Sequence, residues 1–276
     1  MIIDGTKIAK DVCTRTKARA NVLPRAPRVL ALAANDTAAT RSYLAMKKRR
    51  ADDAGCVLEV LQFPQTVSER ELIAAMVASD ADALLAQLPL PGGIDVQVVC
   101  DAIPFDKDAD VLSSAARDAF ARGEAGALVP PVVGAIAEVF ARYDILPKGK
   151  RAVVVGSGFL VGAPAAAWLV EQGAETIVVT IETPVAERNA ALREADIIVS
   201  GAGTPRLITP DLIRDGVVLV DAGTSELGGE IVGDVDPACA KKCALFTPVP
   251  GGLGPLAVAK LFENAVFLAE RKVSFS

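Results

Sequence analysis

The stretch "VVVGSGFLVGAP" (153–164) decides the fold of the region around it. A run of valines leads into three glycines, Gly156, Gly158 and Gly162, and then into a segment typical of a helix. A strand, a tight glycine turn and a helix in this order direct backbone N–H groups toward a pyrophosphate. Gly162 comes one residue later than in the common G-x-G-x-x-G fingerprint. The pattern predicts a dinucleotide site, with an ordinary glycine turn as the alternative.

Short apolar runs continue on both sides of this stretch and alternate with longer segments typical of helices. This alternation is typical of parallel sheets built from strand–helix–strand units. The runs 28–34, 56–63 and 81–88 are predicted as buried strands, and the runs 151–156, 176–180, 196–201 and 216–223 as a second set of strands. The segments predicted as helices are 38–54, 67–79, 131–146, 162–173, 184–195, 209–214 and 254–272. We therefore expect an α/β protein of two domains with a cleft between them, linked through the helix at 131–146.

Composition limits the classes of function. The chain has 276 residues, 51% of them hydrophobic and 23% charged, which is enough to bury a sizeable core. A net charge of −5 argues against a nucleic-acid-binding protein, whose binding face needs clustered Lys and Arg. No apolar run has the length of a membrane span, and the start, "MIIDGTKIAKD", lacks the layout of a signal peptide. We expect a cytoplasmic protein with no nucleic-acid or membrane partner.

Histidine is absent from the sequence. This excludes His-based triads and His-ligated metals, so proton transfer must use Lys, Tyr, Asp, Glu or water. The five cysteines form no regular framework, which is typical of a reducing compartment. Cys239 and Cys243 are close in sequence, but without further soft ligands nearby they indicate a short helix. No metal site is predicted.

A second stretch, "TPVPGGLGPLAVA" (247–259), predicts a rigid loop before the last helix. Its prolines and glycines are too dense for a helix or a regular strand. The exposed backbone of such a loop suits contact with a flat ligand, and a purely structural turn is the alternative. The loop resembles that of the bifunctional methylenetetrahydrofolate dehydrogenase/cyclohydrolase family.

Other stretches are similar to motifs of the same family and occur in the same order, so that the resemblance covers nearly the whole chain. They are "IDGTKIA" (3–9), "YLAMK" (43–47), "LLAQLPLP" (84–91), "DKDAD" (106–110) and "GDVD" (233–236). Some positions depart from the family. Val111 replaces a glycine, Ala257 replaces a threonine, "LVPPVVG" (128–134) replaces a Cys-Thr-Pro segment, and "NDTAAT" (35–40) replaces Asp-Pro-Ala-Ser. The chain is identified as a divergent member.

The resemblance implies a division of the chain and an assembly. Residues 1–125 and the C-terminal helix (254–276) would form the folate-binding catalytic domain. Residues 126–253 would form a Rossmann-like NAD(P)-binding domain. A homodimer is implied as well, formed through the nucleotide-binding domains.

The resemblance also implies roles for particular residues. Tyr43 and Lys47 are four residues apart and share a helical face. Beside Lys48, Arg49 and Arg50, that spacing alone indicates only a solvated surface pair. In the family, the pair is an aromatic platform for the pterin ring next to a catalytic amine. The family reaction removes a hydride from 5,10-methylenetetrahydrofolate and hydrolyses the methenyl product to 10-formyltetrahydrofolate.

Lys47 would then be the general base and acid of the hydrolysis. It needs a lowered pKa, because a protonated amine would be repelled by the methenyl cation. Gln87 would orient the amine, its alternative being a polar strand end. Asp110 would accept hydrogen bonds from the amino-pyrimidine edge of the pterin, its alternative being a solvated loop charge. The remaining predicted substrate contacts, from the proline-rich loop, are Pro250, Gly251 and Gly252.

The predicted cofactor contacts are Gly156, Ser157, Gly158, Val161, Gly162 and Glu182. Glu182 follows the strand "TIVVT" (176–180), where a carboxylate can accept hydrogen bonds from ribose hydroxyls but repels a 2′-phosphate. Ser157 replaces the family's arginine in the glycine turn. We therefore expect a preference for NAD over NADP. Alternatively, Glu182 belongs to the start of the next helix, with Thr183 as its cap and Pro184 as its first residue.

Two other functions remain open from the sequence. One is a folate dehydrogenase that has lost the hydrolytic step. The other is a non-catalytic dinucleotide-binding protein, which would need neither the Lys47–Gln87 pair nor the proline-rich loop.

Overall fold

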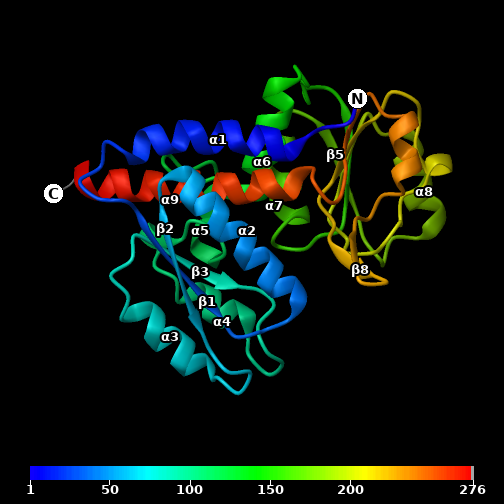
Figure 1. Ribbon diagram of the computed structural model, residues 1–276. Coiled ribbons are helices and arrows are strands. Elements are labelled where there is room, and N and C mark those ends of the chain that lie inside the picture. Colours follow the sequence, from blue (N-terminus) through cyan, green and yellow to red (C-terminus); the bar gives the residue numbers. More distant parts are fainter. Residues whose placement is uncertain (275–276) are drawn as a thin grey trace. The chain divides into compact units, whose positions relative to one another are not determined.

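The computed structural model describes residues 1–274, apart from the side chains of residues 38, 39 and 274. The chain forms two compact units, which we name after their main sheets (Figure 1). The five-stranded unit contains Met1–Ile8 and Val132–Ala257. The three-stranded unit contains Ala9–Pro131 and the residues from Val258 on. Both sheets are entirely parallel, and the predicted α/β class is confirmed.

The five-stranded sheet has the order β10-β7-β6-β4-β5. Its strands are β4 (Arg151–Val155), β5 (Glu175–Val179), β6 (Ile197–Ser200), β7 (Val218–Asp221) and β10 (Leu245–Thr247). The helices of this unit are α6 (Pro131–Arg142), α7 (Gly162–Glu171) and α8 (Val185–Glu194), with 3₁₀ turns η2 (Pro210–Leu212) and η3 (Pro237–Lys241). A small antiparallel hairpin joins β8 (Ser225–Leu227) and β9 (Glu230–Val232). The core includes Val153, Ile198 and Leu219 from three adjacent strands.

The two edges of this sheet differ. At β10 the N-terminal residues add a bridge between Ile2 and Phe246, and the Ile3 N–H donates to the Phe246 carbonyl at 2.9 Å. These first residues therefore lie in the five-stranded unit. Strand β5 forms the opposite edge, and Ile177 and Val178 on it are exposed.

The three-stranded sheet has the order β2-β1-β3 and is formed by β1 (Arg28–Ala33), β2 (Val57–Gln62) and β3 (Ala83–Gln87). Its helices are α2 (Ala38–Ala54), α3 (Glu69–Val77), α4 (Val96–Asp101) and α5 (Ser114–Ala121), with the 3₁₀ turn η1 (Phe105–Lys107). Helices α1 (Gly5–Ala20) and α9 (Leu253–Ser274) begin in the five-stranded unit and continue here. They run side by side in Figure 1, linked by an Arg19–Glu270 ion pair of 2.6 Å.

Several local predictions were wrong. The segment 209–214 forms no α-helix but only the 3₁₀ turn η2, because so short a segment cannot propagate a helix. The run 56–63 was expected to be buried, yet β2 lies at a sheet edge and is mostly exposed. Within residues 1–274 no helix combines the length and apolar character that crossing a membrane requires.

Candidate active site

Helix α2 brings Lys47 to the carboxyl end of β3. The helix begins after Thr37, whose hydroxyl accepts the Thr40 N–H at 3.1 Å, and it ends at Gly55 in the left-handed conformation. The Lys47 Nζ donates to Gln87 Oε1 at 3.0 Å. The Gln87 Nε2 donates to the Leu88 carbonyl at 2.8 Å, which turns the amide oxygen toward the amine. Two residues forty positions apart thus form one buried pair.

The electrostatics of Lys47 match its expected chemistry. Only 9% of the residue is exposed, and burial lowers the pKa of its amine, opposed by the negative charge of Asp110. Lysine amines with lowered pKa can accept a proton near neutral pH. The pKa of Asp110 is raised by burial and by Asp108, while Lys47 opposes this rise. The three-stranded unit therefore groups Lys47, Gln87 and Asp110.

The basic residues 47–50 of α2 lie on different faces of the helix. Tyr43 is half-buried one turn before Lys47, on the same side of the helix. Lys48 and Arg49 are exposed, and Arg50 pairs with Asp53 at 2.8 Å. Lys47 is thus the one buried amine of this run, and its neighbours are the surface charges that the sequence pattern indicated.

The glycine turn between β4 and α7 has the close packing that its sequence predicts. Gly156 has φ +98°, and a Cβ there would lie 2.8 Å from the Gly201 carbonyl oxygen. A Cβ on Gly162 would collide with the carbonyl oxygen of Gly156. At Gly158, by contrast, a Cβ would meet open space, and Val161 at the start of α7 makes no side-chain cap. Packing requires the first and third glycines, whereas the second leaves room beside an uncapped helix start.

Glu182 and Ser157 are both exposed on the five-stranded unit. Glu182 lies between β5 and α8, and its N–H donates to the Thr180 hydroxyl at 3.2 Å. Helix α8 begins only at Val185, and the Thr183 hydroxyl accepts from the Thr180 N–H instead of capping the helix. Thr183 is therefore not the cap and Pro184 is not the first helical residue, and the role of Glu182, which precedes α8, stays a prediction.

The proline-rich loop packs against the N-terminal segment. The Gly5 N–H donates to the Gly251 carbonyl at 2.9 Å, and a Cβ on Gly5 would collide with the Gly252 carbonyl oxygen. Gly251 has φ +93°, and Gly252 is buried against Pro248. Pro250 is exposed. Gly5 near the N-terminus thus packs against the turn formed by Pro250, Gly251 and Gly252, and Pro250 at the tip of this turn is exposed to solvent.

Sequence reasoning missed several buried carboxylates, among them Asp221, Asp234 and Asp108. Asp221 accepts N–H groups from Gly223 and Val235 at 3.0 Å, and Asp234 accepts the Ser200 hydroxyl at 2.7 Å. Burial raises the pKa of Asp221 to about 7. Asp108 is fully buried, and the N–H groups of two following residues, Leu112 and Ser113, donate to its carboxylate. They share no local sequence signal: Asp221 ends strand β7, Asp234 follows Gly233, and Asp108 follows the turn η1.

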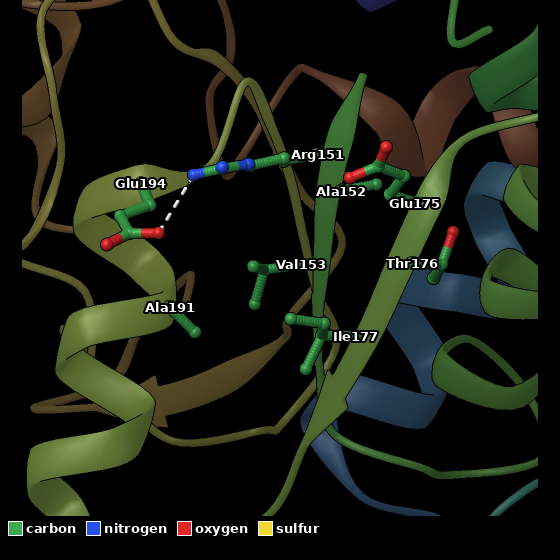
Figure 2. Close-up of a pocket in the computed structure, with 8 residues that line it drawn as sticks. All are labelled: Arg151, Ala152, Val153, Glu175, Thr176, Ile177, Ala191 and Glu194. Carbon is green, nitrogen blue, oxygen red and sulfur yellow. Dashed lines mark hydrogen bonds and ion pairs between the residues drawn. The ribbon is translucent and has the colours of Figure 1, made fainter. Parts of the chain in front are cut away.

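A hollow of about 380 Å³ lies elsewhere, at the amino ends of β4 and β5 (Figure 2). Val153, Ile177 and Ala191 line it with apolar side chains, and an Arg151–Glu194 ion pair of 2.9 Å crosses its rim. Ligands of open α/β sheets bind at the carboxyl ends of the strands. We therefore assign the glycine turn, at the opposite end of β4, as the candidate nucleotide site.

Comparison with known proteins agrees with this arrangement. Residues 3–110 match the model of the tetrahydrofolate dehydrogenase/cyclohydrolase catalytic domain, and residues 130–273 match that of its NAD(P)-binding domain. A protein of Nautilia profundicola described as bifunctional protein FolD is 33% identical over 278 residues, 98% of this chain and 97% of that protein.

Two solved structures are similar over the whole fold. The bifunctional FolD of Campylobacter jejuni has a TM-score of 0.93 and 29% identity, and the match covers 99% of both chains. The Trypanosoma brucei enzyme, solved with NADP and an inhibitor, also has a TM-score of 0.93 and 29% identity, covering 99% of this chain and 98% of that one. The family predicted from the sequence is confirmed: this chain belongs to the tetrahydrofolate dehydrogenase/cyclohydrolase family.

Proposed function

We propose that this protein oxidises 5,10-methylenetetrahydrofolate to the 5,10-methenyl form with NAD(P) and hydrolyses that product to 10-formyltetrahydrofolate. The observation that carries the proposal is the buried Lys47 amine, held by Gln87 at 3.0 Å, whose pKa is lowered by burial. A dinucleotide-binding protein without activity would need no buried amine of lowered pKa. Membership of the family and the cytoplasmic location expected from the sequence are consistent with this role.

Lys47 is the proton carrier of the hydrolytic step. The neutral amine removes a proton from water as the water oxygen bonds to the methenyl carbon. The protonated amine then returns that proton to the ring nitrogen. The carbon–nitrogen bond breaks as the hydroxyl group derived from water releases its remaining proton to solvent, which leaves the formyl group. Gln87 holds the amine in position through both states, because its oxygen can accept from either –NH₂ or –NH₃⁺.

Asp110 and Tyr43 would hold the pterin ring. A carboxylate can accept two N–H donors from the amino-pyrimidine edge, and the half-buried tyrosine offers an aromatic face. Pro250, Gly251 and Gly252 are proposed as backbone contacts of the substrate, since the tip of their turn is exposed. These roles are carried over from the family motifs, residue by residue.

The glycine turn fits a dinucleotide. Gly156, Ser157, Gly158, Val161 and Gly162 would hold the pyrophosphate, because the space at Gly158 is open and the first N–H groups of α7 have no side-chain cap. The bound nicotinamide supplies the acceptor for the hydride. The chain's own contribution is to orient the two reactants and to exclude bulk water from Lys47.

We propose NAD as the preferred cofactor. Glu182 is exposed between β5 and α8, and the Gly156 N–H donates to the Val179 carbonyl at 2.8 Å, which ties the end of β5 to the glycine turn. A carboxylate near the adenosine ribose favours the 2′-hydroxyl and repels a 2′-phosphate. Arg188, the nearest basic residue in sequence, lies on α8 against its neighbour Asn189 at 3.4 Å.

The matched test of cofactor preference is Glu182→Arg against Glu187→Arg, since Glu187 is also exposed but lies on α8. Only the first variant should shift kcat/KM toward NADP, by roughly tenfold or more, because it replaces repulsion by attraction. Equal kcat/KM for the two cofactors in the parent protein, or the same shift in both variants, would contradict the preference.

We propose a homodimer formed through the edge of the five-stranded sheet. Strand β5 is open at this edge, Ile177 is 54% exposed, and Val170 and Ile181 nearby are exposed as well. Because a twofold axis pairs the same surface on both copies, one charge introduced at Ile177 appears twice in the interface. Ile177→Lys should give a monomer in light scattering, whereas Val22→Lys, on the other unit, should leave a dimer. A monomeric parent protein would refute this assembly.

The catalytic claim is tested with Lys47→Met and, as control, Lys48→Met on the exposed face of the same helix. Supplied with methenyltetrahydrofolate, the first variant should hydrolyse it about 10²–10⁴-fold more slowly, because the substitution keeps volume and removes the proton carrier. The second should be near the parental rate. Parental hydrolysis by Lys47→Met would exclude Lys47 as the base.

A further inference from the structure

The turn that carries Asp110 is strained. Val111, the next residue, has φ +56° and is 3% exposed. A β-branched residue in the left-handed region is a genuine outlier, because its side chain crowds the backbone. Such a conformation persists only where the surroundings determine it. Glycine would adopt it without crowding, so this chain needs another device to keep the turn formed.

The Asp108 carboxylate holds the residues after the strained position. Its Oδ1 accepts the Leu112 N–H at 3.0 Å. Its Oδ2 accepts the Ser113 N–H at 2.8 Å and the Ser113 hydroxyl at 2.7 Å. The side chain is fully buried, and burial raises the pKa of Asp108 while these hydrogen bonds oppose the rise. A buried carboxylate with three donors closes the turn on its C-terminal side.

Asn264 of α9 holds the residue before Asp110. Its Nδ2 donates to the Ala109 carbonyl at 2.9 Å and to the Val129 carbonyl at 2.9 Å. Asp110 therefore lies between two fixed points, Ala109 on one side and the Asp108-bound residues on the other. The remaining acid of the loop, Asp106, is exposed and takes no part in this arrangement.

We propose that Asp108 and Asn264 are positioning residues for folate binding: they hold the strained turn at Val111 and so fix the position of Asp110. This inference rests on the proposed role of Asp110 in binding the pterin. Neither residue touches substrate in this scheme. Each acts through the backbone of residues 109–113. The turn depends on these two residues because Val111, unlike a glycine, disfavours its left-handed conformation.

The first test is Asp108→Asn, which keeps the shape but turns one acceptor into a donor facing an N–H group. The KM for methylenetetrahydrofolate should rise about tenfold, while the KM for the dinucleotide stays at the parental value. Asp106→Asn is the matched control and should change neither KM. Unchanged folate KM in folded Asp108→Asn would overturn the positioning role.

The second test is rescue. In Asp108→Asn/Val111→Gly the turn no longer depends on the carboxylate, so the folate KM should return to within about threefold of the parental value. A merely structural role predicts no such return, because the double variant loses a buried valine side chain as well. A double variant with the KM of Asp108→Asn would contradict the proposal.

Asn264→Ala decides the question where Asp108→Asn does not fold, since it removes only the tie to Ala109 and Val129. It should show the same rise in folate KM, and a parental KM would overturn the inference. Asp110→Ala separates this inference from the proposed function. An unchanged folate KM in Asp110→Ala refutes the role of Asp110 itself. A raised folate KM in Asp110→Ala, with parental values in Asp108→Asn and Asn264→Ala, refutes only the positioning role.

Discussion

Asp221 makes the stability of the five-stranded unit depend on pH. Its side chain is 1% exposed at the end of β7, and burial, assisted by the nearby Asp234 carboxylate, raises its pKa from 3.8 to about 7. A carboxyl group with a raised pKa favours the folded state while it is protonated and loses that advantage as pH rises through the folded-state pKa. The difference between the folded-state and unfolded-state pKa of Asp221 corresponds to about 4 kcal/mol in the free energy of unfolding. About 3 kcal/mol of this is lost between about pH 5 and pH 9.

Asp221→Asn should remove this dependence. The amide cannot ionise, so the free energy of unfolding of the parent should fall by about 3 kcal/mol relative to the variant across this range. The variant should also be less stable at acid pH by about 1–3 kcal/mol, because one acceptor of a backbone N–H becomes a donor. The comparison between the two proteins cancels the titration of groups that do not interact with Asp221.

Trp168 provides the assay. It is the single tryptophan of the chain, lies on α7 in the same unit as Asp221, and packs edge-on against Phe140 at 5.6 Å between ring centroids. Urea unfolding followed by its fluorescence therefore reports this unit. Asp215→Asn, at an exposed position before β7, is the control and should keep the parental pH dependence. Parallel curves for the parent and Asp221→Asn would refute the burial argument.

The remaining predictions concern the amine and its neighbours. Gln87→Ala should slow methenyl hydrolysis roughly 10- to 100-fold, because the amine loses its 3.0 Å hydrogen bond, and a parental rate in a stopped-flow assay would count against an orienting role. Asp110→Ala should raise the folate KM roughly 10- to 100-fold, and steady-state kinetics with unchanged KM and kcat would remove it from the site. The same variant should also move the acid limb of the hydrolysis rate to lower pH, because Asp110 raises the pKa of Lys47. An unmoved limb would contradict that coupling.

Local patterns predicted the strand–turn–helix of the nucleotide site correctly. The valine run, the glycines and the following helix are all encoded within a dozen residues, so a short window contains the whole signal. The helix with Lys47 was equally clear. The contact between Lys47 and Gln87 could not be predicted from local patterns, because forty residues separate them. Only the resemblance to a family indicated that they meet. The catalytic roles of both residues are still predictions.

Other features depend on partners that are distant in sequence. Nothing near Ile2 indicates that it bridges to Phe246, and nothing near Asp108 indicates full burial. Val111 is the clearest case: its side chain disfavours a positive φ, so local propensity predicts the opposite of the observed conformation. Strand β2 has an apolar sequence yet lies at an edge, because strand order is a property of the whole sheet.

The most direct test of the central claim is to mix the protein with 5,10-methylenetetrahydrofolate and either NAD or NADP and to follow the absorbance of the methenyl product. We predict that this absorbance rises only briefly and then falls as 10-formyltetrahydrofolate forms, faster with NAD than with NADP. With Lys47→Met, the methenyl form should accumulate beyond the parental level. Accumulation to the same level in the parent would identify an enzyme without the hydrolytic step, and no methenyl signal with either cofactor would contradict the account as a whole.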